Sequence, residues 1–149
     1  MRQLVFIVVF VAPLILISQI SDRILQLNKF DLNEGLKIQN DVREFYDLEK
    51  LLLDEELSKK AQIWANHLAA VDSLLISDDE FGESVFWVDM EYIDTYNKNI
   101  FKEASLNWLL SKGEEDENTY LQIVSEKSTK IGIGIASSLS SHYVVAKYY

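Results

Sequence analysis

The spacing of apolar residues changes along this chain, from helical periodicity in the first half to alternation in the last third. That change is the strongest constraint on its fold. Between Asp54 and Ala70 the apolar residues recur every three or four positions, as they do on one face of a helix. Asp54 is a typical N-cap residue, and the two glutamates after it suit the positive end of a helix. The predicted buried stripe consists of Leu57, Ala61, Trp64, Ala65 and Leu68.

Two further segments have helical features. The apolar residues between Asp31 and Asp47 follow roughly helical spacing. The stretch from Phe101 to Lys112 predicts another helix, which Gly113 ends. The acidic run that follows, residues 114–117, predicts a solvent-exposed loop. It does not predict a calcium site, because it lacks the regular spacing of calcium ligands.

The last third of the chain is rich in Ile, Val and Tyr with period-two patterning. Tyr120–Ser125, Thr129–Ala136 and His142–Tyr149 are therefore predicted as strands, and the serine-rich residues 137–141 as a hairpin turn. Helices early and strands late predict an α+β domain in which helices pack on an antiparallel sheet.

Gly132 and Gly134 remove alternate side chains from one face of a predicted strand. Bare positions in a strand usually allow another element to approach closely. The glycines do not indicate a phosphate-binding loop, since a third glycine, a lysine and a following helix are missing.

Composition narrows the possible functions. The length of 149 residues suits one domain. Acidic residues outnumber basic ones 24 to 14, giving a net charge of −10, which argues against nucleic acid or an anionic membrane as a partner. The chain has no cysteine and only two histidines, so it offers few groups for metal binding or acid–base catalysis.

The amino terminus indicates the secretory pathway. Arg2 precedes an apolar run from Leu4 to Ile17, and small polar residues follow, which is the order of a signal peptide over residues 1–21. Residues 22–149 would then form a secreted or extracellular domain, held together by packing without disulfides. The alternative is an uncleaved anchor that keeps the domain on a membrane in that pathway, although the run is short for a full span.

Several segments, in order, resemble the superfamily of cysteine-rich secretory proteins, antigen 5 and pathogenesis-related 1 proteins (CAP). In lacking cysteine, the chain resembles the Golgi-associated plant-pathogenesis-related branch of this superfamily, which relies less on disulfides. The resemblance implies a three-layer α-β-α sandwich with a central, mainly antiparallel sheet. The matching segments are Asn40–Arg43, Leu53–Ala65, Gly82–Trp87, Gln122–Val124, Ser128–Ala136 and Tyr143–Tyr149.

The family typically carries two histidines and two glutamates that hold a divalent metal in a cleft. The matching positions here are Tyr46, Glu83, Ser111 and Thr119. One carboxylate with a phenol and two hydroxyls is a poor donor set for zinc, so we expect no metal and no other cofactor. An alternative role for Glu83 is to accept backbone N–H hydrogen bonds and fix the adjoining loop.

Neither histidine matches a ligand position. His67 lies on a polar flank of the predicted helix and His142 follows the hairpin turn, so both are expected to be exposed.

Three functions remain open. The first is a non-catalytic module that binds a sterol, a lipid or an extracellular protein, with Trp87 and Trp108 as a candidate apolar groove or, alternatively, as core residues. The second is a hydrolase, but the sequence shows no histidine base beside a candidate nucleophile. The third is a structural or self-associating protein, a possible homodimer, in which residues 131–136 and 143–149 pair at a sheet edge.

Overall fold

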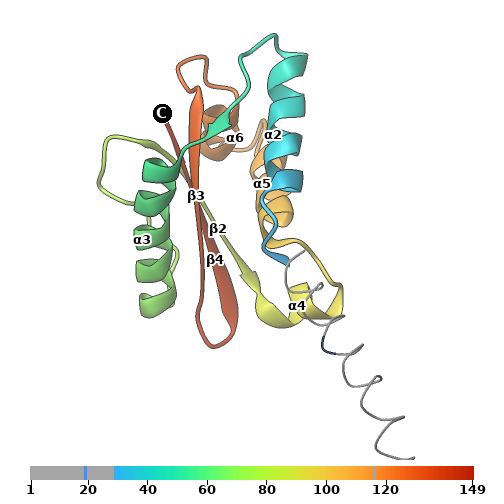
Figure 1. Ribbon diagram of the computed structural model, residues 1–149, viewed down its shortest axis with the longest axis vertical. Coiled ribbons are helices and arrows are strands. Elements are labelled where there is room, and N and C mark those ends of the chain that lie inside the picture. The colour runs from blue at the N-terminus through green and yellow to red at the C-terminus, as the bar shows by residue number, and fades with distance from the viewer. Residues whose placement is uncertain (1–18, 20–28, 116) are drawn as a thin grey trace, which may run out of the picture.

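The computed structural model describes residues 19, 29–115 and 117–149 and places them in three layers (Figure 1). A central sheet lies between α3 on one side and α2, α5 and α6 on the other. This arrangement confirms the α+β, three-layer α-β-α prediction. The elements are α2 (Asn33–Phe45), β1 (Leu52–Leu53), α3 (Glu55–Val71), β2 (Gly82–Asp89), α4 (Met90–Thr95), α5 (Ile100–Leu110), α6 (Asn118–Ile123), β3 (Lys130–Ser137) and β4 (Ser141–Tyr148).

The predicted leader, residues 1–21, lies outside the described residues apart from Gln19. Within the described part of the chain, no helix combines the length and the hydrophobicity that crossing a bilayer requires.

The sheet is mainly antiparallel, as expected, with strand order β1-β3-β4-β2. Only the short β1–β3 pairing is parallel. The face toward α5 carries Ile131 and Ile133, which pack with Phe101 and Trp108 in the larger core. The opposite face packs against α3 in a second core. Its buried members are Ala61, Ala65, Leu68, Tyr143 and Val145.

Helix α3 begins where the sequence predicts. The Asp54 carboxylate accepts a hydrogen bond from the Leu57 N–H at 2.9 Å, and the predicted stripe is buried except at the half-buried Trp64. The two strand glycines allow the close approach that the sequence predicts: a Cβ on Gly132 or Gly134 would overlap the backbone of α3. Helix and strand therefore touch through main-chain atoms.

That close approach lets α3 cover the edge of β3. Strand β1 pairs only with Lys130 and Ile131, which leaves the rest of β3 without a neighbouring strand on that side. The Ser58 hydroxyl accepts from the Ile133 N–H at 3.2 Å. Gln62 exchanges two hydrogen bonds with the Ile135 backbone, at 3.0 and 2.8 Å.

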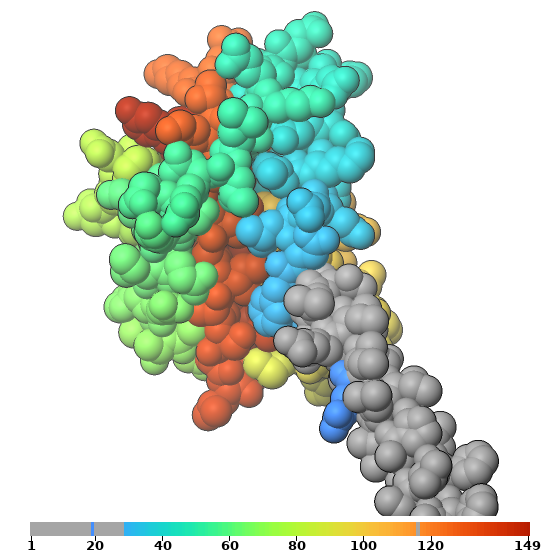
Figure 2. Space-filling model, viewed as in Figure 1, coloured from blue at the N-terminus to red at the C-terminus, as the bar shows by residue number. Residues whose placement is uncertain are grey.

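The spacings of helix and strand match at this edge. Four residues of helix rise about 6 Å and two residues of strand about 6.7 Å, so side chains four apart on α3 reach alternate β3 residues. They take the place of a partner strand. In Figure 2 the orange-red surface of the β3–β4 hairpin is visible between α3 and α2.

One predicted strand is wrong. The segment Tyr120–Ser125 begins in helix α6. Tyr120 and Ile123, one helical turn apart, are buried, whereas Leu121 between them is 46% exposed. Packing on α5 and β2 overrides the strand preference of this short apolar run. Strand β2, at the edge of the sheet, does not follow from the periodicity of the sequence.

The predicted route to self-association is also wrong. Strand β4 lies between β3 and β2, so both of its edges are paired. Strand β3 is bounded by β4 on one side and by β1 and α3 on the other. The outer strands of the described sheet are β1 and β2, and dimerisation itself stays a prediction.

Candidate functional site

Three of the four predicted cleft positions meet where α2, α5 and α6 end or begin. Tyr46 is the C-cap residue of α2, Ser111 is that of α5, and Thr119 lies in the first turn of α6. The hydroxyls of Ser111 and Thr119 are 2.9 Å apart. Ser111 also donates to the Trp108 carbonyl at 2.9 Å and accepts from the Tyr120 N–H at 3.2 Å. These two hydroxyls therefore join α5 to α6.

Sequence reasoning missed Lys112 and Tyr120, which complete the polar end of this site. The Tyr46 phenol oxygen accepts from Lys112 Nζ at 2.8 Å and from the Tyr120 hydroxyl at 3.0 Å. The hydrogen bond from Lys112, and then that from Tyr120, lower the pKa of Tyr46. The same contact with Tyr46 raises the pKa of Lys112, so its ammonium stays protonated at neutral pH.

Beside this cluster lies an open cavity of about 370 Å³. Its walls are mostly apolar, and Phe45 at its rim is 79% exposed. We call this cavity and its polar end the α2–α5–α6 cleft. It is lined by Asp41, Val42, Phe45, Tyr46, Leu109, Lys112 and Tyr120.

The fourth predicted position, Glu83, lies on the other face of the sheet. Along β2, Phe86 and Val88 pack into the core on the α5 side, whereas Val85 packs against α3, and alternation places Glu83 with Val85. The transfer of a four-residue cleft from the family pattern is therefore wrong for Glu83. Its neighbours belong to the loop after α3.

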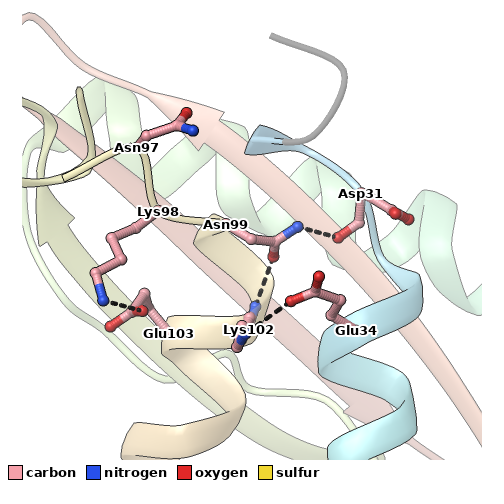
Figure 3. A pocket seen from close by; sticks show the side chains of 7 residues that line it. All are labelled: Asp31, Glu34, Asn97, Lys98, Asn99, Lys102 and Glu103. Carbon is pink, nitrogen blue, oxygen red and sulfur yellow. Dashed lines mark hydrogen bonds and ion pairs between the residues drawn. The ribbon is translucent and has the colours of Figure 1, made fainter. Parts of the chain in front are cut away.

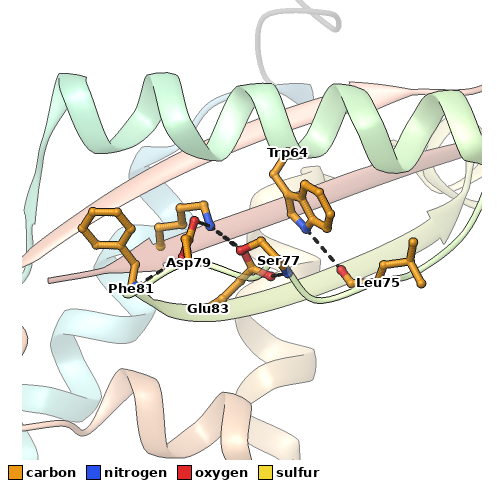
Figure 4. Close-up of polar contacts among 7 residues, drawn as sticks. Trp64, Leu75, Ser77, Asp79, Phe81 and Glu83 are labelled. Carbon is orange, nitrogen blue, oxygen red and sulfur yellow. Dashed lines mark hydrogen bonds and ion pairs between the residues drawn. The ribbon is translucent and has the colours of Figure 1, made fainter.

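Figure 4 shows these neighbours. The Glu83 carboxylate accepts from the Ser77 N–H at 2.8 Å, the Ser77 hydroxyl at 2.6 Å and Lys147 Nζ at 2.6 Å. The contacts with Ser77 agree with the alternative interpretation, in which Glu83 fixes the adjoining loop.

Lys147 is the central residue of this cluster and is 1% exposed. Its ammonium also contacts Asp79 at 2.5 Å and the Ser77 hydroxyl at 2.8 Å. Burial raises the pKa of Asp79, but hydrogen bonds from Lys147 and the Phe81 N–H outweigh it, and the net shift is downward. A lysine next to a serine resembles a catalytic pair, but here the lysine ammonium forms ion pairs with the carboxylates of Asp79 and Glu83.

The two tryptophans do not form a common groove. Trp108 is 1% exposed in the main core and donates from its ring to the Val85 carbonyl at 3.0 Å. Trp87 is 51% exposed and borders a different hollow beside Tyr143, on the α3 side. Trp108 is therefore a core residue, which was the alternative interpretation to a groove.

The Asn-x-x-Arg segment is structural. Asn40 forms two hydrogen bonds with the Leu51 backbone, at 2.8 and 3.1 Å. The guanidinium of Arg43 is fully buried, and burial lowers its pKa. It connects α2 to the loops at the same end of the domain through the carbonyls of Glu49, Ile123, Ser125 and Ser128.

A second hollow, of about 290 Å³, lies between the starts of α2 and α5 (Figure 3). Its charged groups pair with one another: Lys102 with Glu34 at 2.8 Å, and Lys98 with Glu103 at 3.7 Å. Asn99 donates to the Asp31 carbonyl at 2.7 Å. The Lys102–Glu34 and Asn99–Asp31 contacts join the starts of the two helices, and the paired charges do not point to a ligand.

The two histidines differ in environment. His67 is exposed, as expected, and stacks on Trp64 with ring centroids 4.7 Å apart. The expectation of an exposed His142 is wrong, because this residue is 2% exposed. Its Nδ1 lies 2.7 Å from the Ser137 hydroxyl, and Phe30 packs edge-on against its ring. Phe30 and Ser137 of β3 cover His142, although its place after the hairpin turn suggests exposure.

A family model described as the cysteine-rich secretory protein family, CAP, matches residues 36–148. This match spans most of the chain. The chain belongs to the CAP family. No curated protein sequence matches it.

Solved structures share the fold. MpPR-1i is 22% identical with a TM-score of 0.56, over 78% of this chain and 84% of that one. A hookworm platelet inhibitor is 17% identical with a TM-score of 0.62, over 81% and 71%. NaASP2, whose structure was solved with Zn²⁺, is 17% identical with a TM-score of 0.65, over 81% of each chain. At these identities the likeness concerns the fold alone.

The residues of this CAP cleft do not fit a zinc ion. Zinc takes thiolate, imidazole or carboxylate ligands, in sets of three or four. Here the lone pairs of Tyr46 already accept two hydrogen bonds, and Ser111 and Thr119 bond to each other. Among the described residues, no group of three or more His, Cys, Asp or Glu side chains is placed to hold a metal.

Proposed function

We propose that this CAP protein is a non-catalytic binding protein of the secretory pathway or extracellular space, and that its α2–α5–α6 cleft takes a lipid or sterol. The observation that carries the proposal is the open cavity of about 370 Å³, whose apolar walls end at a small polar cluster. An apolar pocket with a few convergent polar groups is the usual form of a small-molecule site. CAP proteins in general are binding proteins, which supports the same view.

The side chains of the cleft argue against catalysis. Its serine and threonine hydroxyls are used in helix-to-helix hydrogen bonds, and no imidazole lines it. The Ser137–His142 contact, which the sequence does not reveal, is also a poor catalytic pair. A catalytic histidine is normally oriented by a carboxylate on its second nitrogen. The buried Nε2 of His142 has no hydrogen-bond partner among the described residues.

The proposal is tested with the full chain and two fluorescent probes, a dehydroergosterol-type sterol and a dansyl fatty acid. Leu109→Glu places a charge in the cleft, and Leu106→Glu places one on the same helix at a residue outside the cleft lining. We expect saturable binding of at least one probe, lost in Leu109→Glu and retained in Leu106→Glu. Binding of neither probe, or equal binding by both variants, would contradict the proposal.

The secretory part of the proposal rests on the leader. N-terminal sequencing of the mature protein from the medium of expressing cells is expected to begin near residue 22. Retention of the intact leader on a membrane fraction would favour the anchored alternative.

A second function, self-association or binding of a protein partner, is favoured by apolar residues exposed beside α3. Trp87 and Ile76 are 51% and 64% exposed, and a hollow of about 220 Å³ lies beside Trp87. Sedimentation equilibrium is expected to show concentration-dependent association that Trp87→Arg reduces. A monomer at all concentrations would exclude self-association. The neighbouring exposed residues are Val71, Leu74 and Leu75.

A further inference from the structure

We infer that the open edge of strand β2, from Val85 to Asp89, binds an extended, basic peptide segment of another protein by adding it to the sheet as an antiparallel strand. The inference rests on the second of the proposed functions, because it names the class of partner for the surface beside Trp87. It does not depend on the α2–α5–α6 cleft, which lies on the other face of the sheet.

The backbone of β2 points alternately toward its neighbour β4 and toward the outer edge of the sheet. The Met90 N–H donates to the Ser140 carbonyl at 2.8 Å, at the end of the β2–β4 pairing. Because residues of an antiparallel pair form hydrogen bonds in alternation, every second residue before Met90 also bonds to β4. The backbone groups of Val85, Trp87 and Asp89 therefore point outward.

Most of these outward groups are open. The Val85 carbonyl accepts from the ring of Trp108 at 3.0 Å, which agrees with the alternation. The N–H groups of Val85, Trp87 and Asp89 and the Trp87 carbonyl have no hydrogen-bond partner among the described residues. Trp87 is 51% exposed, so an extended segment can reach them. Unpaired groups at a sheet edge are a template for strand addition.

A hollow beside this edge fits a basic side chain. It has a volume of about 220 Å³ and is lined by Asp72, Trp87 and Tyr143, among others. A residue directly opposite Trp87 in an antiparallel pair has its side chain on the same face, toward this hollow. A guanidinium there can stack on the indole ring and pair with the Asp72 carboxylate. The Tyr143 hydroxyl donates to that carboxylate at 2.8 Å and holds it in place.

The charge of the surrounding segment favours a basic partner. Residues 61–97 contain eight acidic residues and no lysine or arginine, and they include the end of α3, the loop after it, β2 and α4. Within the described residues, ion pairs neutralise only Asp79, Glu83 and Asp94 of these eight. A cationic segment is therefore attracted to this side of the molecule. The other five are exposed: Asp72, Asp78, Glu80, Asp89 and Glu91.

The test uses a short peptide, capped at both ends, in which arginine alternates with valine. Fluorescence anisotropy of a label on the peptide measures its binding to the full chain. We expect saturable binding that is lost when glutamate replaces the arginines. N-methylation of the arginines, whose backbone groups face β2, should abolish binding, and N-methylation of the valines should not.

Substitutions separate the backbone of the edge from its side chains. Trp87→Pro removes an N–H that β4 does not use, and an edge strand tolerates proline there, so binding should be lost in a folded protein. Trp87→Thr keeps the N–H and removes the ring, which should weaken binding about tenfold. Asp72→Asn keeps the acceptor for Tyr143 and should weaken binding about threefold. Asp78→Asn, outside the hollow lining, is the matched control and should leave binding unchanged.

Thermal melting verifies that each variant is folded, and the N-methylated peptides test the inference on the unaltered chain. Equal binding of the arginine and glutamate peptides, or of the two N-methylated peptides, would overturn the inference. Absence of peptide binding would also overturn it. If Trp87→Arg then still reduces self-association in sedimentation, the surface beside Trp87 serves a second copy and the second function stands. Neither peptide binding nor self-association would overturn both.

Discussion

Removal of the buried Lys147 ammonium is expected to destabilise the fold far more than removal of a half-exposed ammonium such as that of Lys130. Lys147→Met leaves the Glu83 carboxylate, whose side chain is 4% exposed, without its cation. Breaking a buried ion pair costs about 3–5 kcal/mol. Glu83 keeps its two hydrogen bonds from Ser77, which favours the lower end, about 3 kcal/mol. At roughly 2–4 °C per kcal/mol, the melting temperature should fall by about 6–12 °C.

Urea denaturation followed by tryptophan fluorescence measures this loss. Lys130→Met is the control, because Lys130 pairs with Asp54 at 3.0 Å while half exposed, and exposed pairs contribute little. The double variant Lys147→Met with Glu83→Leu removes both buried charges and should recover much of the stability. A single variant within about 1 kcal/mol of the wild type would refute this account, as would a double variant no more stable than the single one.

Three further predictions concern α3 and His142. Gln62→Ala removes both hydrogen bonds to the Ile135 backbone, so it should lower the free energy of unfolding by about 1–3 kcal/mol. Because it uncovers the edge of β3, it should also raise self-association in sedimentation, and the control Lys59→Ala should do neither. Gly134→Ala should cost about 1–3 kcal/mol in urea denaturation, because its methyl group overlaps the α3 backbone at Ala61; an unchanged midpoint would contradict that packing. Burial, and then the nearby Lys29, lower the pKa of His142 in the folded state, so stability is full above about pH 6.5 and falls below it as the unfolded state binds the proton. His142→Phe should flatten that pH profile between about pH 7 and 5, and His67→Gln should not.

Much of the fold follows from local pattern. The apolar stripe and N-cap of α3, and the alternating strands β3 and β4, appear where periodicity and capping chemistry place them. The glycines of β3 also indicate the close approach of another element. In contrast, the sequence predicts a strand where α6 forms, because a six-residue apolar segment has no periodicity long enough to decide between the two structures.

The site is less predictable for a physical reason. Tyr46, Ser111 and Thr119 can be found by family position, but their hydrogen-bond partners depend on how three helix ends converge. Lys112 follows a helix in the sequence like many solvent-exposed lysines, and only the fold brings it within 2.8 Å of Tyr46. Likewise Lys147 alternates with apolar strand residues, and its burial against Glu83 depends on the loop after α3.

The most direct test of the central claim is whether a lipid or sterol occupies the α2–α5–α6 cleft. Full-chain protein with ¹³C-labelled methyl groups is titrated with a sterol and with a fatty acid, and the methyl shifts are followed by NMR. The account predicts saturable shift changes at Val42 and Leu109, which line the cleft, and none at Leu106, which lies outside the lining. Shift changes confined to residues outside the cleft, or none that saturate, would contradict the account.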